Sequence, residues 1–137
     1  MATEQALYDF TKKELLRRYP SGWGGVAGMC LSDGTFISSI SPDFPNAGSS
    51  VCMELGAMLE AANRDLAVTH TLCLVREDEH APIKILTPCG ICQERLSLWG
   101  NAVRCGITTA DPTSLHFASL QELQPHHWLQ VYADESK

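Results

Sequence analysis

Two short segments, far apart in the chain, constrain its fold more than any other feature. They are Cys52-Met53-Glu54 and Pro88-Cys89-Gly90-Ile91-Cys92. Together they supply three thiols and one carboxylate. Cysteine thiolates bind zinc well, and a catalytic zinc commonly has three protein ligands and one position open to water. If Cys52, Cys89 and Cys92 are the ligands, the fold has to bring both segments to one point, with Glu54 beside them as a proton carrier.

Each segment also predicts the start of a helix. A Cys-x-x-Cys pair in a first helical turn places both sulfurs on one side, where unpaired backbone amides and the positive end of the dipole stabilise thiolates. We therefore expect a helix over residues 90–99. A second helix is expected over 51–63, with Cys52 and Glu54 in its first turn. Its expected cap is Ser49 or Ser50, and its expected apolar face consists of Leu55, Met58, Leu59 and Ala62.

A Cys-x-x-Cys pair alone is a weak signal, because redox pairs and structural zinc sites contain it too. The upstream Cys52-x-Glu54 pair sharpens it. A closed structural zinc site would need one more Cys or His. The remaining cysteines lie in apolar runs that predict buried strands, where a free cysteine behaves as a small hydrophobe, and they are poor candidates for a fourth ligand. They are Cys30, Cys73 and Cys105. A closed zinc site, or a set of buried free cysteines, remains the alternative.

Composition bounds the function. Ten basic residues stand against sixteen acidic ones, a net charge of −6, so we expect no nucleic-acid partner. The first residues are polar and no apolar run approaches membrane-spanning length, so we expect a cytoplasmic protein without a membrane partner. Six cysteines in such a chain favour metal and thiol chemistry over disulfides. The length of 137 residues suits one catalytic domain, 1–137.

The order of the expected elements predicts the fold class. The hydrophobic pattern and the turn residues predict helices at 3–18, 51–63, 90–99 and 119–123, strands at 25–31, 35–40, 71–76, 103–108 and 116–118, and a short approach at 83–86. Asp33-Gly34 is a strong signal for a hairpin turn between the first two strands. A helix and a hairpin, followed by strands that alternate with helices, favour a layered α/β sandwich with a mixed sheet.

The chain resembles the zinc-dependent cytidine deaminase superfamily, whose signature is a His or Cys, one residue, a Glu, and later Pro-Cys-x-x-Cys. The resemblance extends over nearly the whole chain. Trp23 through Asp33-Gly34 is similar to the opening hairpin of the family, and 120–128 is similar to its Glu-Leu-Leu-Pro segment. It implies a three-layer α/β/α sandwich with a mixed five-stranded sheet. The short chain and three-cysteine site are similar to the homotetrameric branch, which implies a homotetramer.

The resemblance also implies the reaction. Hydroxide on Zn²⁺ adds to C4 of a cytosine ring, Glu54 moves protons to the ring nitrogen and to the leaving amine, and ammonia departs to give the uracil product. The expected ligands of the zinc are Cys52, Cys89 and Cys92, and the partner is a small nucleoside-type substrate, as in pyrimidine salvage. An aromatic at the place of Trp23 packs on the substrate in the family.

The sequence departs from the family at the sugar and at the metal. The Asn-x-Glu that holds the ribose hydroxyls falls on Ser41-Pro42-Asp43, so these positions are weaker candidates for sugar binding. Leu55 follows the glutamate, as in the blasticidin S deaminases, and an antibiotic or modified cytosine nucleoside is the alternative substrate. A non-catalytic zinc-binding module is the alternative from another class. Where relatives tend to place an Arg, this chain has Leu55 and Gln93, so Arg95, Arg64 or helix amides would have to offset the charge of three thiolates.

Overall fold

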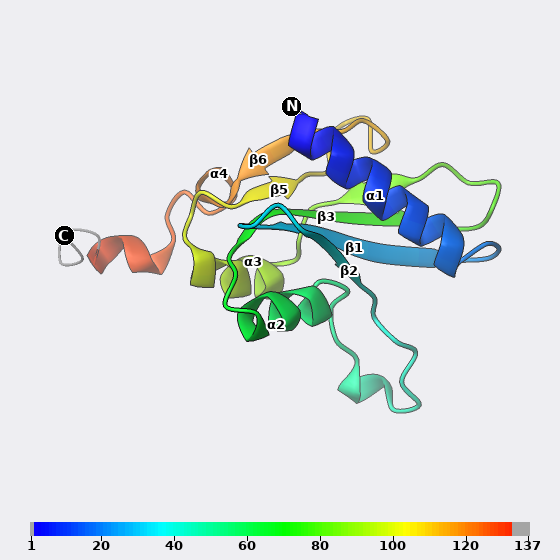
Figure 1. Ribbon diagram of the computed structural model, residues 1–137, viewed down its shortest axis with the longest axis horizontal. Helices are drawn as coiled ribbons and strands as arrows, with labels where there is room; N and C mark the ends of the chain where they lie inside the picture. Colours follow the sequence, from blue (N-terminus) through cyan, green and yellow to red (C-terminus); the bar gives the residue numbers. More distant parts are fainter. Residues whose placement is uncertain (1, 133–137) are drawn as a thin grey trace.

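The computed structural model describes residues 2–132 of the chain. Its strands form one sheet and its longest helix leads into them (Figure 1). In chain order the elements are α1 (Ala2–Arg18), β1 (Gly24–Leu31), β2 (Phe36–Ser39), η1 (Ala47–Ser49), α2 (Leu55–Asn63), β3 (Val68–Arg76), β4 (Lys84–Leu86), α3 (Gly90–Leu96), η2 (Ser97–Trp99), β5 (Arg104–Gly106), β6 (Phe117–Ser119), α4 (Leu120–Leu123) and η3 (Trp128–Tyr132), where η marks a 3₁₀ helix.

The sheet is mixed, as the sequence predicts. Its strand order is β2-β1-β3-β5-β6, in which β3 and β5 are parallel and the other pairs antiparallel. Five strands form this continuous path, and the short β4 adds a sixth, antiparallel to β3. Strand β5 pairs with β3 at His70 and Thr71, whereas β4 pairs with it from Cys73 to Val75. Two short strands thus share one edge of β3, and β4 leads the chain to the first residues of α3.

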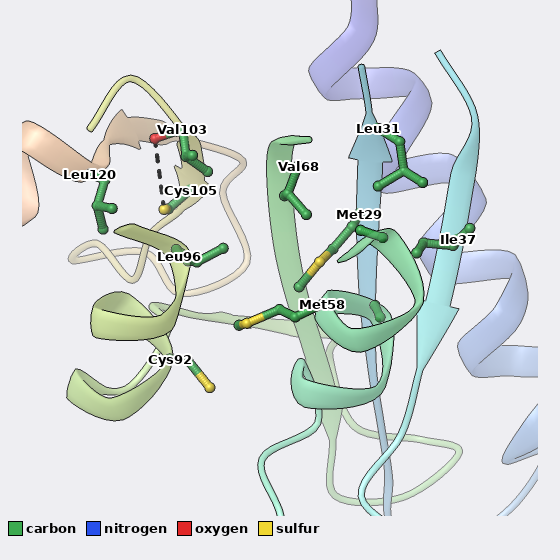
Figure 2. Close-up of a cluster of buried hydrophobic side chains, with 12 residues drawn as sticks. Met29, Leu31, Ile37, Met58, Val68, Cys92, Leu96, Val103, Cys105 and Leu120 are labelled. Atoms are coloured by element: carbon green, nitrogen blue, oxygen red, sulfur yellow. Dashed lines mark hydrogen bonds between the residues drawn. The ribbon is translucent and has the colours of Figure 1, made fainter. Parts of the chain in front are cut away.

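Helices cover both faces of the sheet, which confirms the α/β/α layering (Figure 1). Helix α1 packs on one face over a core of aliphatic side chains, and α2 and α3 pack on the other. The first core consists of Leu7, Leu15, Val26, Leu72, Leu74 and Ile85. The second contains several sulfur atoms, among them those of Met29, Met58, Cys92 and Cys105, and Figure 2 shows Met58 reaching from α2 toward α3.

The first hairpin forms where the Asp33-Gly34 signal predicts it. Gly34 has a φ of +87°, in the left-handed region that glycine adopts without steric cost. The side-chain oxygen Oδ1 of Asp33 accepts a hydrogen bond from the backbone amide of Thr35 at 2.9 Å. The backbone amide of Leu31 donates to the carbonyl of Thr35 at 2.8 Å and closes the turn. Local turn chemistry therefore sets the register of β1 against β2.

Three expectations about the second helix, its start, its cap and its apolar face, are wrong in detail. Helix α2 begins at Leu55, so Cys52 precedes it and Glu54 occupies the N-cap position. Ser49 belongs to the 3₁₀ helix η1 and Ser50 is its C-cap, so neither serine caps α2. The residues of α2 that are buried in the chain are Ala57, Met58 and Ala61, whereas Leu59 is 60% exposed. The apolar face expected from the sequence thus lies half in the core and half on the surface.

The described residues contain no helix that is both long and apolar enough to cross a membrane. The longest helix, α1, carries acidic and basic residues at its ends.

Candidate metal centre and catalytic carboxylate

The structure brings the three predicted thiols together. The Sγ atoms of Cys52, Cys89 and Cys92 all lie within 4.8 Å of one another, and Cys52 and Cys89 are 3.5 Å apart. Cys52 lies in the turn before α2, Cys89 occupies the N-cap position of α3, and Cys92 lies in its first turn. Cys92 is fully buried and Cys89 is exposed. Figure 2 shows the side chain of Cys92 directed from α3 toward α2.

Backbone and polar contacts hold the two segments in place. The hydroxyl of Ser39, at the end of β2, donates to the carbonyl of Met53 at 2.5 Å and fixes the turn before α2. The side-chain amide of Gln93 donates to the carbonyl of Pro88 at 2.8 Å. Thr87 and Thr108 each accept, through Oγ1, a hydrogen bond from the other's backbone amide, at 2.8 and 3.1 Å. The cysteines are therefore presented by segments tied to the sheet rather than by free loops.

Glu54 lies beside the thiols. It is only 5% exposed and makes no side-chain cap for α2, although it occupies the capping position. Its Oε2 accepts a hydrogen bond from Cys92 Sγ at 3.3 Å. A carboxylate that is buried, free of a capping role and next to a thiol cluster is placed where a proton carrier would act.

The surroundings shift the pKa values of Cys89 and Cys92 in opposite directions. Hydrogen bonds from backbone amides, that of Cys92 first, lower the pKa of Cys89. Burial, followed by the charge of Glu54, raises the pKa of Cys92 well above its ordinary value. A metal ion that binds here has to displace the Cys92 proton, so its affinity should depend on pH.

The charge of three thiolates is not met by a side-chain cation. Across residues 2–132, the structure shows no hydrogen bond or ion pair from a lysine or arginine to the three thiols. Arg64 pairs with Glu60, and Gln93 binds the carbonyl of Pro88. The sequence leaves open whether Arg95, Arg64 or helix amides offset the thiolate charge. The structure shows the amides in this role, because hydrogen bonds from the start of α3 reach Cys89.

The donor set fits zinc. Zinc–sulfur bonds of about 2.3 Å in tetrahedral geometry separate two sulfurs by roughly 3.8 Å. The observed cluster has this scale. Cys, His, Asp and Glu side chains of the described residues offer no fourth atom within the same group. Three sulfur ligands with a fourth position free is the pattern of a catalytic rather than a structural zinc site.

The predicted substrate residues are placed less decisively than the thiols. Trp23 is 55% exposed, and its ring meets Tyr19 edge to face with centroids 6.1 Å apart. Its Cη2 atom and the Met53 Sδ atom lie over the same point of Gly25, so Trp23 does reach the segment that carries Glu54. Ser41 and Asp43 lie in the loop after β2, and among the described residues neither side chain makes a hydrogen bond. The contact of this loop with a sugar stays a prediction.

Sequence reasoning missed Cys73 as a neighbour of the site. This residue of β3 is 3% exposed, and its Sγ lies 3.9 Å from Met53 Sδ. Burial raises the pKa of its thiol well above the usual range, and the charge of Glu54 adds to the shift. The strand alternation contained a signal: Leu72 and Leu74 face α1, so Cys73 between them must face the opposite side, where the predicted metal segments lie.

Comparison with known proteins identifies the family. The cytidine deaminase from Bacillus anthracis is 50% identical to this chain, with 96% of this chain and 94% of that chain covered and a TM-score of 0.92. The cytidine deaminase from Burkholderia pseudomallei is 18% identical, with 90% and 98% covered and a TM-score of 0.67. That from Mycobacterium leprae is 16% identical, with 87% and 98% covered and a TM-score of 0.64. These two show the fold alone.

Neither a protein-family model nor a curated protein matches the chain. The identity of 50% over almost the full length of both chains nevertheless goes well beyond a shared fold. Taken with the thiol cluster and the mixed sheet between two helical layers, it shows that this chain belongs to the cytidine deaminase superfamily of hydrolytic aminohydrolases.

Proposed function

We propose that the protein is a zinc-dependent deaminase that converts a cytosine nucleoside, cytidine, deoxycytidine or a close analogue, and water into the uracil nucleoside and ammonia. One observation carries the proposal: Cys52, Cys89 and Cys92 converge within 4.8 Å beside the buried Glu54, in a chain half identical to a cytidine deaminase. We place the reaction in cytoplasmic pyrimidine salvage, with the whole chain, 1–137, as one catalytic domain.

The position of Glu54 beside the thiols supports the roles that we propose for the site residues. A zinc ion held by the three thiolates would lower the pKa of a water molecule, so that a nucleophile exists near neutral pH. Glu54 takes a proton from the attacking water and delivers it to the ring nitrogen as the oxygen bonds to C4. It then takes the proton of the new C4 hydroxyl and delivers it to the amine, so that ammonia leaves and C4 becomes the carbonyl of the uracil product. The carboxylate suits this work because it is buried, held against Cys92 and not used to cap α2.

The substrate is expected to contact both the segment before α2 and the loop after β2. Trp23 offers a half-exposed aromatic surface for the base or sugar. Ser41 and Asp43 are the candidates for the sugar hydroxyls. Because Asp43 is exposed and its carboxylate is shorter than a glutamate's, the sugar clamp is expected to be weak. This observation favours a modified cytosine nucleoside such as blasticidin S as the second candidate substrate.

A spectrophotometric screen of cytidine, deoxycytidine, free cytosine and blasticidin S tests the proposal. We expect loss of the cytosine absorbance and release of one ammonia per turnover with at least one nucleoside. Glu60→Gln is the matched control for Glu54→Gln and should keep this turnover, since Glu60 is a carboxylate of α2 that pairs with Arg64 at the surface. No turnover of any of the four by zinc-loaded protein would contradict the proposed function.

We also propose that the protein assembles as a homotetramer through the surface that α2 and η2 share. A surface pocket of about 240 Å³ is lined almost entirely by apolar side chains, namely those of Leu55, Met58, Leu59, Ala62, Leu98 and Trp99, with Arg95 at its side. Leu59 and Leu98 are 60% and 69% exposed. An apolar surface of this kind is typical of an interface.

Light scattering at micromolar concentration should give the mass of four chains. Leu59→Glu should lower that mass, whereas Glu60→Gln, a neighbouring change outside the pocket, should not. A fully active monomer of the unchanged protein would rule out the assembly.

A further inference from the structure

The residue between the first ligand and the proton carrier has an unusual environment. The backbone of Met53 is fixed by the hydrogen bond from Ser39 to its carbonyl. Its side chain reaches the sheet, where Sδ lies 3.9 Å from Cys73 Sγ in the centre of β3. In the chain, Met53 stands between Cys52, a member of the thiol cluster, and the buried Glu54. Its thioether therefore extends from the segment that carries both residues to the strand β3.

A glycine of β1 makes this position possible. A Cβ atom on Gly25 would lie 2.7 Å from Met53 Sδ and 2.9 Å from Cη2 of Trp23. Real Cβ atoms do not approach other heavy atoms so closely, so any larger residue at position 25 has to displace both side chains. The sulfur of Met53 and the ring edge of Trp23 thus meet over the bare backbone of Gly25. Together they form one apolar surface, to which the residue directly before Glu54 contributes.

We propose that Met53 is a specificity-determining residue, whose thioether forms with the indole of Trp23 the wall against which the pyrimidine ring of the substrate packs. The inference rests on the proposed function. A ring that presents its C4 atom between the thiol cluster and Glu54 extends over several ångströms. This wall is an apolar surface formed in part by Met53, the residue between Cys52 and Glu54. Substituents on the ring have to fit against it.

Methionine gives such a wall a particular character. Its unbranched side chain adapts to the shape of its partner, and its sulfur makes favourable contacts with aromatic rings. The Trp23 ring is half exposed and is backed by Tyr19 rather than by the core. We therefore infer that the wall yields to ring substituents only as far as Met53 can move, because Gly25 and Cys73 close the space behind it.

The experiment compares cytidine with 5-methylcytidine as substrates of zinc-loaded Met53→Ala, Met53→Val and Met53→Leu. Met53→Ala should raise the ratio of kcat/KM for 5-methylcytidine over cytidine by about 10-fold or more, the discrimination associated with one methyl group in an apolar pocket. Met53→Val should raise it less, and Met53→Leu, which keeps the volume, should leave it unchanged. Zinc content and the thermal unfolding midpoint identify any variant that fails to fold, and Met53→Val then stands in for Met53→Ala.

A pair of changes tests the geometry itself. Gly25→Val alone should lower kcat/KM for cytidine, because its side chain displaces Met53 and Trp23. Gly25→Val combined with Met53→Ala should recover activity relative to Gly25→Val, because the valine then refills the wall. An unchanged substrate ratio in Met53→Ala and Met53→Val, or two changes whose effects simply add, would overturn the inference while leaving the proposed function intact. An unchanged protein that deaminates no cytosine nucleoside overturns both.

Discussion

The two faces of β1 use glycine for different ends. On the α1 face, a Cβ on Gly28 would lie 1.9 Å from Oγ1 of Thr11, so this glycine lets α1 pack close to the strand. On the other face, the bare backbone of Gly25 receives side chains that border the candidate site, those of Met53 and Trp23. Gly28 thus allows a helix to pack closely on the strand, and Gly25 leaves room for two side chains beside the candidate site.

Buried polar groups show the same contrast. The hydroxyl of Thr11 is fully buried and donates to the carbonyl of Leu7, within its own helix, at 2.7 Å. Glu54 is nearly as buried but contacts a thiol from a different helix. A polar group satisfied inside one element adds little beyond stability, whereas a carboxylate held between two elements is available to other partners. Changes on the α1 face should therefore alter stability, and changes on the α2 and α3 face should alter activity.

The largest effect is expected from Cys92→Ala. This fully buried thiol joins α3 to the cluster, so its loss should remove bound zinc, lower the yield of soluble protein and reduce activity to background. Metal analysis and thermal unfolding measure the first two effects. Cys105→Ala is the matched control, since Cys105 is equally buried in the same core but lies outside the cluster, and it should keep its zinc. A Cys92→Ala protein with full zinc and activity would contradict the assignment.

Glu54→Gln should separate catalytic activity from zinc binding. The amide has the shape of the carboxylate but cannot carry the proton, so kcat should fall by ~10²–10⁴-fold while zinc content and the unfolding midpoint stay near those of the unchanged protein. Steady-state kinetics with metal analysis measure both. Loss of zinc in this variant would show a structural role for Glu54 instead, and near-normal turnover would remove it from the mechanism.

The parts of this molecule that the sequence predicts are those in which the chemistry is local. The Asp33-Gly34 turn needs only its own side chain and backbone, and the two cysteine segments carry their ligands in a fixed spacing. The start of α2 escapes prediction because Met53 is held by Ser39, a contact between residues 14 apart in sequence. The register of β3, set by β1 and β4, decides that Cys73 meets Met53.

The surface of α2 teaches a related lesson. Periodicity places Leu55, Met58 and Leu59 on one face, and this face exists, but it continues past the core to a surface pocket. A single sequence does not distinguish an apolar side chain of a helix that packs on its own sheet from one that lies beside it at the surface, because both belong to the same apolar stripe. Leu59 is thus predictable as apolar but not as exposed within one chain.

Gly28→Ala tests the α1 face, with a moderate expected effect on stability. Its Cβ would collide with Thr11 Oγ1, and overpacking of this kind costs about 1–3 kcal/mol in the free energy of unfolding. The activity of the folded fraction should stay unchanged. Combining Gly28→Ala with Thr11→Ala removes the hydroxyl and should recover part of the loss, with a remaining contact of 3.0 Å to the Thr11 Cβ. Denaturant unfolding and steady-state kinetics together show whether a change on the α1 face alters stability without altering activity.

The smallest effect is expected from Asp43→Ala, at the edge of the α2 and α3 face. Asp43 is exposed, so a hydrogen bond from a sugar hydroxyl to its carboxylate should contribute only ~0.5–1.5 kcal/mol, which is a loss of about 2–10-fold in kcat/KM for cytidine. Free cytosine lacks the hydroxyls and is the internal control, so its kcat/KM should not change. Equal losses on the nucleoside and the free base would show that Asp43 does not contact the sugar. In that case the loop after β2 would affect activity through its connection to Ser39 and Met53, not through recognition of ribose.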